Sequence, residues 1–290
     1  MKLNKLLLMA LCTTVSTVAF AQSRELVNPD EIRVTTFVPG APLQVLGGST
    51  LLDTRSGLVN SPGTGAGGAD ESLLQDSSLA MGTFGFAVGS TTAFRIADDF
   101  TVPASGWNVS DITVYTYQTG STTTSTITGL TLQIWDGDPS LGTSSVVFGD
   151  TTTNVLSSTA FTNIYRGLES APGATNRPIM AATASGLSID LPAGTYWLDF
   201  QIAGSLGSGP WAPPLTVSGQ STTGNGLQFD GSAWVAVIDV GGQGFPMTIG
   251  GAGGGVPFTP PRELPVNSGW LLLALLGGLL GFGALAIVRR

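Results

Sequence analysis

Apolar and polar residues alternate in short runs over residues 94–249, and turn residues separate the runs. Successive side chains of a strand point to opposite faces, so an alternation of period two predicts half-buried strands. The clearest run, 127–135, places Leu130, Leu132 and Ile134 on one face. No run shows the 3.6-residue period of an amphipathic helix, so the pattern predicts an all-β body.

The runs that we expect to form strands share this alternation and end at glycine, proline or small polar residues. They are 94–102, 111–118, 127–135, 145–148, 160–165, 186–191, 195–202, 226–229, 233–238 and 246–249. Weaker candidates precede them at 31–38, 43–46 and 49–52, and residues 70–76 are expected to form one helical turn. Many short strands with frequent turns are typical of an antiparallel β-sandwich, including the jelly-roll type.

Changes in composition divide the chain into segments. Residues 22–90 are expected to form an irregular arm with a few short strands, and 91–249 the sandwich domain. Residues 250–263 are rich in glycine and proline, which predicts a linker that is flexible at first and stiffer where prolines follow.

The end of the chain has the character of a membrane span. Residues 270–288 contain no charged side chain. A helix of this length measures roughly 28 Å, close to the ~30 Å hydrocarbon core of a bilayer. Trp270 lies where an interfacial aromatic belongs, and Arg289 and Arg290 lie where cytoplasmic positive charges belong. We therefore expect a transmembrane helix at 270–288.

The start of the chain has the pattern of a secretory signal peptide. Lys2 and Lys5 precede an apolar stretch, and Ala19 and Ala21 form an A-x-A site before Gln22. We expect signal peptidase to cleave between Ala21 and Gln22, which makes 1–21 a signal peptide and the remainder an exported protein.

A short motif precedes the apolar tail. The residues that carry it are Leu264, Pro265, Ser268, Trp270, Arg289 and Arg290. Together they resemble bacterial C-terminal sorting signals of the IPTL-CTERM type, cousins of the PEP-CTERM signals that exosortases process. The family motif reads roughly Ile-Pro-Thr-Leu-Ser-x-Trp, from which Val266 and Asn267 depart. The resemblance covers 264–290 and implies an exosortase-like membrane enzyme that removes or exchanges the tail. On this interpretation the body passes the inner membrane and reaches the cell surface or extracellular matrix.

Composition excludes several classes of function. Beyond residue 21 the chain has no Cys, Lys or His, so imidazole-dependent nucleophiles, imidazole metal sites and Schiff-base lysines are absent. The formal net charge of −8 argues against nucleic-acid binding. A pair of carboxylates can hydrolyse a glycoside without histidine, but no spacing here sets two carboxylates at a chosen separation. We expect neither an enzyme nor a cofactor.

Acidic residues provide one candidate site. Asp98 and Asp99 lie within an expected strand, and Asp136 and Asp138 lie in an expected turn. Calcium binds six to eight oxygens, which carboxylates at strand ends can supply, so a structural calcium site is one interpretation. The alternative is that Asp136 belongs to hairpin turn chemistry and that the others cap strands or remain solvated.

Aromatic residues provide the other candidate site. Trp135 and Trp197 fall on the faces opposite the main apolar rows. One hypothesis is an aromatic platform on which sugar rings stack; the alternative is that both faces of the sheet are covered. The sequence thus predicts a structural or adhesive protein of the cell surface or matrix, with an exopolysaccharide-binding module as the alternative.

Overall fold

The computed structural model describes residues 22–28 and 49–254. The expected signal peptide, the weak strand candidates at 31–38 and 43–46, and the sorting signal at 264–290 lie outside these residues. In the described ranges, no helix is long and apolar enough to cross a membrane.

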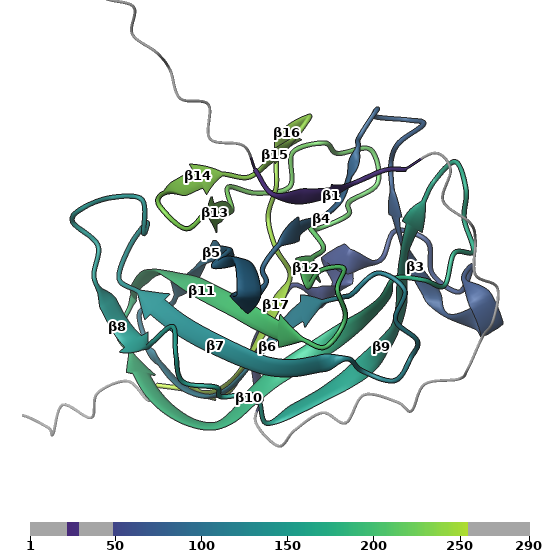
Figure 1. Cartoon of the computed structure of the whole chain (residues 1–290). Coiled ribbons are helices and arrows are strands. Elements are labelled where there is room, and N and C mark those ends of the chain that lie inside the picture. The colour runs from purple at the N-terminus through teal and green to yellow at the C-terminus, as the bar shows by residue number, and fades with distance from the viewer. Residues whose placement is uncertain (1–21, 29–48, 255–290) are drawn as a thin grey trace, which may run out of the picture. The chain divides into compact units, whose positions relative to one another are not determined.

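The described chain is all-β, and its strands form two six-stranded sheets (Figure 1). The first, called the β6 sheet, has the order β2 (Ser49–Asp53), β17 (Met247–Gly253), β6 (Trp107–Thr116), β10 (Pro178–Leu191), β9 (Ser158–Leu168) and β3 (Asp70–Leu74). The second, called the β11 sheet, has the order β14 (Trp234–Ala236), β13 (Leu227–Phe229), β5 (Arg95–Val102), β11 (Gly194–Gly204), β7 (Ile127–Trp135) and β8 (Val146–Gly149).

Smaller elements complete the described fold. A three-stranded sheet has the order β1 (Arg24–Leu26), β4 (Thr83–Ala87) and β12 (Trp211–Ala212), and β15 (Ile238–Asp239) pairs with β16 (Gly241–Gly242). The helical elements among the described residues are three short 3₁₀ turns: η1 (Arg55–Leu58), η2 (Ala66–Gly68) and η3 (Ser90–Thr92).

Four antiparallel strand pairs are nested within one another along the chain. β7 pairs with β8, β6 with β10, β5 with β11, and β2 with β17. Each pair encloses the previous one in sequence, as in a single long hairpin, and successive pairs alternate between the two sheets. The β6 sheet is mixed, because β3 pairs in parallel with β9.

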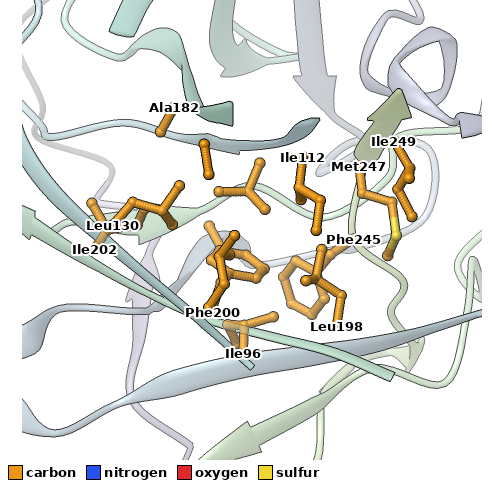
Figure 2. Close-up of a cluster of buried hydrophobic side chains, with 14 of the residues drawn as sticks. Ile96, Ile112, Leu130, Ala182, Leu198, Phe200, Ile202, Phe245, Met247 and Ile249 are labelled. Carbon is orange, nitrogen blue, oxygen red and sulfur yellow. The ribbon is translucent and has the colours of Figure 1, made fainter. Parts of the chain in front are cut away.

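The main hydrophobic core lies between the facing sides of the two six-stranded sheets. In Figure 2, Leu198 and Phe200 from the β11 sheet face Ile112 and Met247 from the β6 sheet. The apolar row expected at Leu130, Leu132 and Ile134 belongs to this cluster, as do Tyr196, Leu198, Phe200 and Ile202 of β11. This confirms the expected row, and burial of these side chains drives the sheets together.

A second cluster occupies the opposite face of the β6 sheet. Tyr115 and Tyr117, which alternate with the core residue Val114, pack there with Phe84 of β4 and with Ile179. The small sheet and the η1 turn therefore supply the cover for this face.

Several stretches differ from the sequence-based expectations. The helical turn predicted at 70–76 is wrong, because Asp70–Leu74 forms β3. Pairing with β9 buries its side chains on both faces, so neither the strand period nor a helix period is visible. Strand pairing also extends beyond the expected 91–249 sandwich: β2 and β3 lie in the β6 sheet, and β17 runs on to Gly253, into the expected linker.

The N-terminal strand β1 is held by specific polar contacts. The backbone of Ser23 exchanges two hydrogen bonds with the side-chain amide of Gln228, at 3.0 and 2.9 Å. Glu25 pairs with the buried Arg177, with 3.1 Å between Oε1 and Nε, and accepts a hydrogen bond from the hydroxyl of Tyr117 at 2.6 Å. Arg177 also lies over the ring of Phe84, 3.6 Å from its centroid.

A second buried arginine lies nearby. Arg166 donates from Nε to the carbonyl oxygen of Phe84 at 2.8 Å, and from one terminal nitrogen to the hydroxyls of Ser72 and Thr216 at 3.0 and 2.8 Å. Burial lowers the pKa of Arg166 to about 10, so it stays charged at neutral pH. Its partners join β9, β4 and β3, which indicates a structural role.

Candidate functional site

The candidate site is the outer face of the β11 sheet, the face that points away from the core. Alternation in β5 and β11 places Arg95, Ala97, Trp197 and Asp199 there, opposite core residues such as Phe200. Register joins these positions: Asp199 pairs with Ala97, and Trp197 pairs with Asp99 and with Trp135. In β13, Phe229 lies beside Arg95 on one side and Trp234 on the other.

Arg95 connects the charged and aromatic parts of this face. Its Nε lies 3.1 Å from Oδ1 of Asp199. The same guanidinium lies 4.3 Å from the ring centroid of Phe229 and 5.2 Å from that of Trp234. A guanidinium that stacks on aromatic rings and pairs with a carboxylate is fixed in position. Arginine suits such a site better than lysine, because its planar group can stack and pair at the same time.

Asp199 is the buried end of this arrangement, with a side-chain exposure of 1%. Burial raises its pKa to about 6, while Arg95 and the indole of Trp135 oppose that rise. The indole Nε1 of Trp135 donates to Oδ2 at 3.2 Å. Asp199 therefore links Arg95 to Trp135 across strands β5, β11 and β7.

The two tryptophans predicted to stack on a ligand lie side by side, but they differ in burial. Trp197 forms a small cluster with Ala97 and Leu227, and its exposed fraction is 6%. Trp135 and Trp234 pack against this cluster and remain partly exposed. The ring surface accessible on this face therefore belongs to Trp135 and Trp234 more than to Trp197.

The acidic residues considered as calcium ligands are not brought together. Asp98 points into the core, where it accepts hydrogen bonds from the backbone N–H groups of Phe245 at 2.5 Å and Asp99 at 3.0 Å. Burial, which outweighs these bonds, raises its pKa to about 7. Asp99 follows in β5 and lies on the other face of the sheet, beside Trp197.

Asp136 and Asp138 organise the turn between β7 and β8. Oδ1 of Asp136 accepts from the N–H of Ser145 at 2.6 Å, and Oδ1 of Asp138 accepts from the N–H of Ser140 at 2.8 Å. These bonds correspond to the turn chemistry given as the alternative. Across residues 22–28 and 49–254, no three acidic side chains group so that they could hold a metal ion.

Sequence reasoning missed the pairing of Arg95 with Asp199 and the stacking on Phe229. A signal existed, because Arg95 alternates with the core residue Ile96 and Asp199 alternates with the core residues Leu198 and Phe200. Opposite charges on the outward positions of two strands are candidates for a cross-strand pair. The missing information was that β5 and β11, far apart in sequence, are neighbours.

Comparison of the chain with protein-family models, with curated proteins and with solved structures finds no match in any of the three. The class of the protein therefore rests on its own features: a sandwich-like all-β body with an aromatic and charged outer sheet face.

Proposed function

We propose that the chain is an exported, non-enzymatic β-sandwich protein of the cell surface or extracellular matrix. On this proposal a signal peptide over 1–21 directs export, and an IPTL-CTERM-like signal over 264–290 directs sorting. Signal peptidase and an exosortase-like enzyme are its processing partners. The tail helix at 270–288 holds the chain in the inner membrane with the body outside until the tail is exchanged.

The observation that carries this proposal is that the two residues directly after the expected cleavage site are hydrogen-bonded to the body. The side-chain amide of Gln22, the residue after the expected cleavage site, donates to the backbone carbonyl of Ala236. Ser23 follows with its paired hydrogen bonds to Gln228. Cleavage before Gln22 would leave these contacts intact, as expected if the fold is that of the processed protein.

The other end of the body agrees with this division. β17 lies in the β6 sheet between β2 and β6 and ends at Gly253, and ten residues separate it from Leu264, where the expected sorting segment begins. Removal of the tail would therefore leave all seventeen described strands in place.

The nested pairing supports a finer description of the body as a jelly roll. In that architecture one long antiparallel hairpin is rolled so that successive strand pairs alternate between two packed sheets. The order β2-β17-β6-β10 in one sheet and β5-β11-β7-β8 in the other has this form. The strands β9 and β3 are added at an edge of the first sheet, and β13 and β14 at an edge of the second.

Intact mass of the protein isolated from producing cells tests the export and sorting proposal. We expect an N-terminus at Gln22 and a mass that lacks the C-terminal tail, which ends at Arg290. A double variant, Pro265→Ala with Trp270→Ala, is expected to keep the tail. A native mass that still includes Arg290 would show that the tail is a stable anchor and that sorting is wrong; a start at Met1 would rule out export by signal peptidase.

A second candidate function, binding of an extracellular polysaccharide, is favoured by the outer face of the β11 sheet. Trp135 and Trp234 present partly exposed rings, and Arg95 adds hydrogen-bond donors between them. Sugar rings stack on such aromatic surfaces while polar groups bind their hydroxyls.

Binding to a glycan array tests this second function. Trp135→Ala, which removes the ring, is expected to lower binding, while Trp135→Phe keeps a ring and is expected to retain most of it. Trp197→Ala is not informative, because it also opens the packed cluster with Leu227. If no glycan on the array binds, the polysaccharide function fails and the structural role remains.

A further inference from the structure

A small pocket opens at the edge of the outer face of the β11 sheet. Its volume is about 230 Å³, and its walls come from η3, β7, β11 and the turn that follows β8. The polar residues that line it are Ser90, Thr128, Thr131, Thr151, Thr152, Asn154 and Gln201. Gln201 and Thr131 are register partners on adjacent strands, so they form the sheet side of the pocket.

The lining contains hydroxyls and amides and no ionisable side chain. Nε2 of Gln201 donates to the carbonyl oxygen of Phe94 at 3.1 Å, and its Oε1 accepts no hydrogen bond from the described residues. The hydroxyls of Ser90 and Thr131 also have no hydrogen-bond partner in that part of the chain. Uncharged groups that can both donate and accept therefore remain available to a ligand.

The wall opposite the sheet is held in place by two side chains. Asp150 accepts hydrogen bonds from the backbone N–H groups of Thr153 and Thr152, at 2.6 and 2.7 Å, and from both of their hydroxyls at 2.8 Å. These bonds keep the pKa of Asp150 below its ordinary value, so the turn persists over a wide pH range.

Asn154 fixes the same wall to β7. Its Oδ1 accepts from the backbone N–H groups of Leu130 at 3.0 Å and Leu156 at 3.1 Å, and its Nδ2 donates to the carbonyl of Thr128 at 3.3 Å. A pocket whose wall is tied to the sheet loses little conformational entropy when a ligand binds.

We propose that this pocket binds one neutral sugar residue of a polysaccharide. A sugar ring carries hydroxyls that donate and accept, which match the hydroxyls and amides of the lining, and a charged ligand would find no counter-charge there. The volume lies below the roughly 300–1,000 Å³ of sites for drug-sized ligands, which suits a single ring. This inference rests on the proposed polysaccharide-binding function and assigns its selective subsite.

The position of the pocket fits a chain that continues across the sheet. Gln201 follows Asp199 by two residues in β11 and so lies on the same outer face, towards Phe94 and Arg95 at the start of β5. Phe229 and Trp234 lie beyond Arg95. A sugar unit bound in the pocket would place the next sugar units of the polysaccharide over Arg95 and these aromatic rings.

Saturation-transfer NMR on the full-length chain tests the pocket, with glucose, galactose and mannose as neutral probes and glucuronate as the charged probe. We expect signal from at least one neutral hexose and none from glucuronate. Thr131→Val and Gln201→Leu are each expected to weaken that binding at least tenfold, while Gly142→Ala, in the turn between β7 and β8 and outside the pocket, leaves it unchanged. Ser90→Ala, at an exposed position, is expected to weaken it even if the strand variants fold poorly.

The outcomes separate this inference from the function on which it rests. If a polysaccharide binds on the array but no neutral hexose binds, or if the pocket variants leave hexose binding unchanged, the pocket assignment is wrong and the polysaccharide function stands. Preferential binding of glucuronate would show that the ligand of the pocket is not a neutral sugar. Two results together would support both the polysaccharide function and the pocket assignment. Trp135→Ala would abolish binding on the array, and Gln201→Leu would abolish binding of the hexose.

Discussion

Nε of Arg95 lies 3.1 Å from Oδ1 of Asp199, on the face of the β11 sheet that points away from the core. The pair joins β5 to β11, and its acidic member is almost fully buried. Removing the partner of a buried charge is costly, because that charge then lacks compensation. Arg95→Ala should therefore lower the free energy of unfolding by about 3 kcal/mol.

The matched control for this pair is Asp199→Asn. The amide oxygen still accepts a hydrogen bond from Trp135 or Arg95, and the Arg95 side chain is 16% exposed, so its charge is less completely buried than that of Asp199. We expect a loss of about 1 kcal/mol in chemical denaturation, clearly less than for Arg95→Ala. Equal losses in the two variants would contradict the view that the cost arises from an uncompensated Asp199.

Stability should decrease as pH rises, because of Asp98. Burial raises its pKa to about 7 in the folded protein, against about 4 in the unfolded chain. The folded state therefore holds a proton that the unfolded state releases. The contribution of Asp98 to stability is fully present below about pH 4 and is lost as pH rises through about 7. The loss is on the order of 4 kcal/mol. Urea unfolding at a series of pH values measures it.

Asp98→Asn isolates this contribution. Its amide oxygen still accepts from the N–H of Phe245 but does not titrate, so the decline between about pH 4 and 7 should become shallower. Asp199, whose pKa is raised to about 6, would account for part of the slope that remains. An unchanged slope in Asp98→Asn would show that Asp98 is not the group responsible.

The accuracy of the sequence-based prediction followed the burial pattern of each strand. The run 127–135 was predicted with its observed bounds, because its core residues alternate with more exposed ones. Residues 178–185, the first part of β10, were missed because 178–184 are buried on both faces and show no alternation. The same double burial explains the incorrect helical turn at 70–76.

The candidate site could be predicted only in part. Alternation correctly placed Trp135 and Trp197 on faces opposite the core rows, but it does not reveal what lies beside them. Neighbours such as Leu227, from a strand thirty residues further on, bury Trp197. The pocket next to Gln201 depends on the packing of a loop against the sheet, which no local pattern encodes.

Glu25 should account for most of the stability that β1 contributes. Its side chain is 12% exposed and pairs with Arg177, which is 4% exposed. Glu25→Ala would remove the carboxylate that pairs with the buried Arg177 and that accepts from the hydroxyl of Tyr117, and we expect the free energy of unfolding to fall by about 3 kcal/mol. Leu26→Ala is the control in the same strand; its side chain is 56% exposed, so a change within about 0.5 kcal/mol is expected. Similar melting temperatures for the two variants would disprove this role of Glu25.

Gly149 should be the most sensitive glycine near the proposed pocket. Its φ of +78° lies in the left-handed region, and an added Cβ would lie 2.0 Å from the carbonyl oxygen of Leu132. Gly149→Ala should therefore cost at least ~2 kcal/mol and displace the turn at Asp150 that forms the pocket wall. Gly142→Ala is the control, because an added Cβ there meets no atom within 4 Å. We expect Gly149→Ala to lower both the melting temperature and hexose binding, because Gly149 directs the chain from β8 into that wall. Gly142→Ala should change neither quantity. Equal behaviour of the two variants would argue against this role of Gly149.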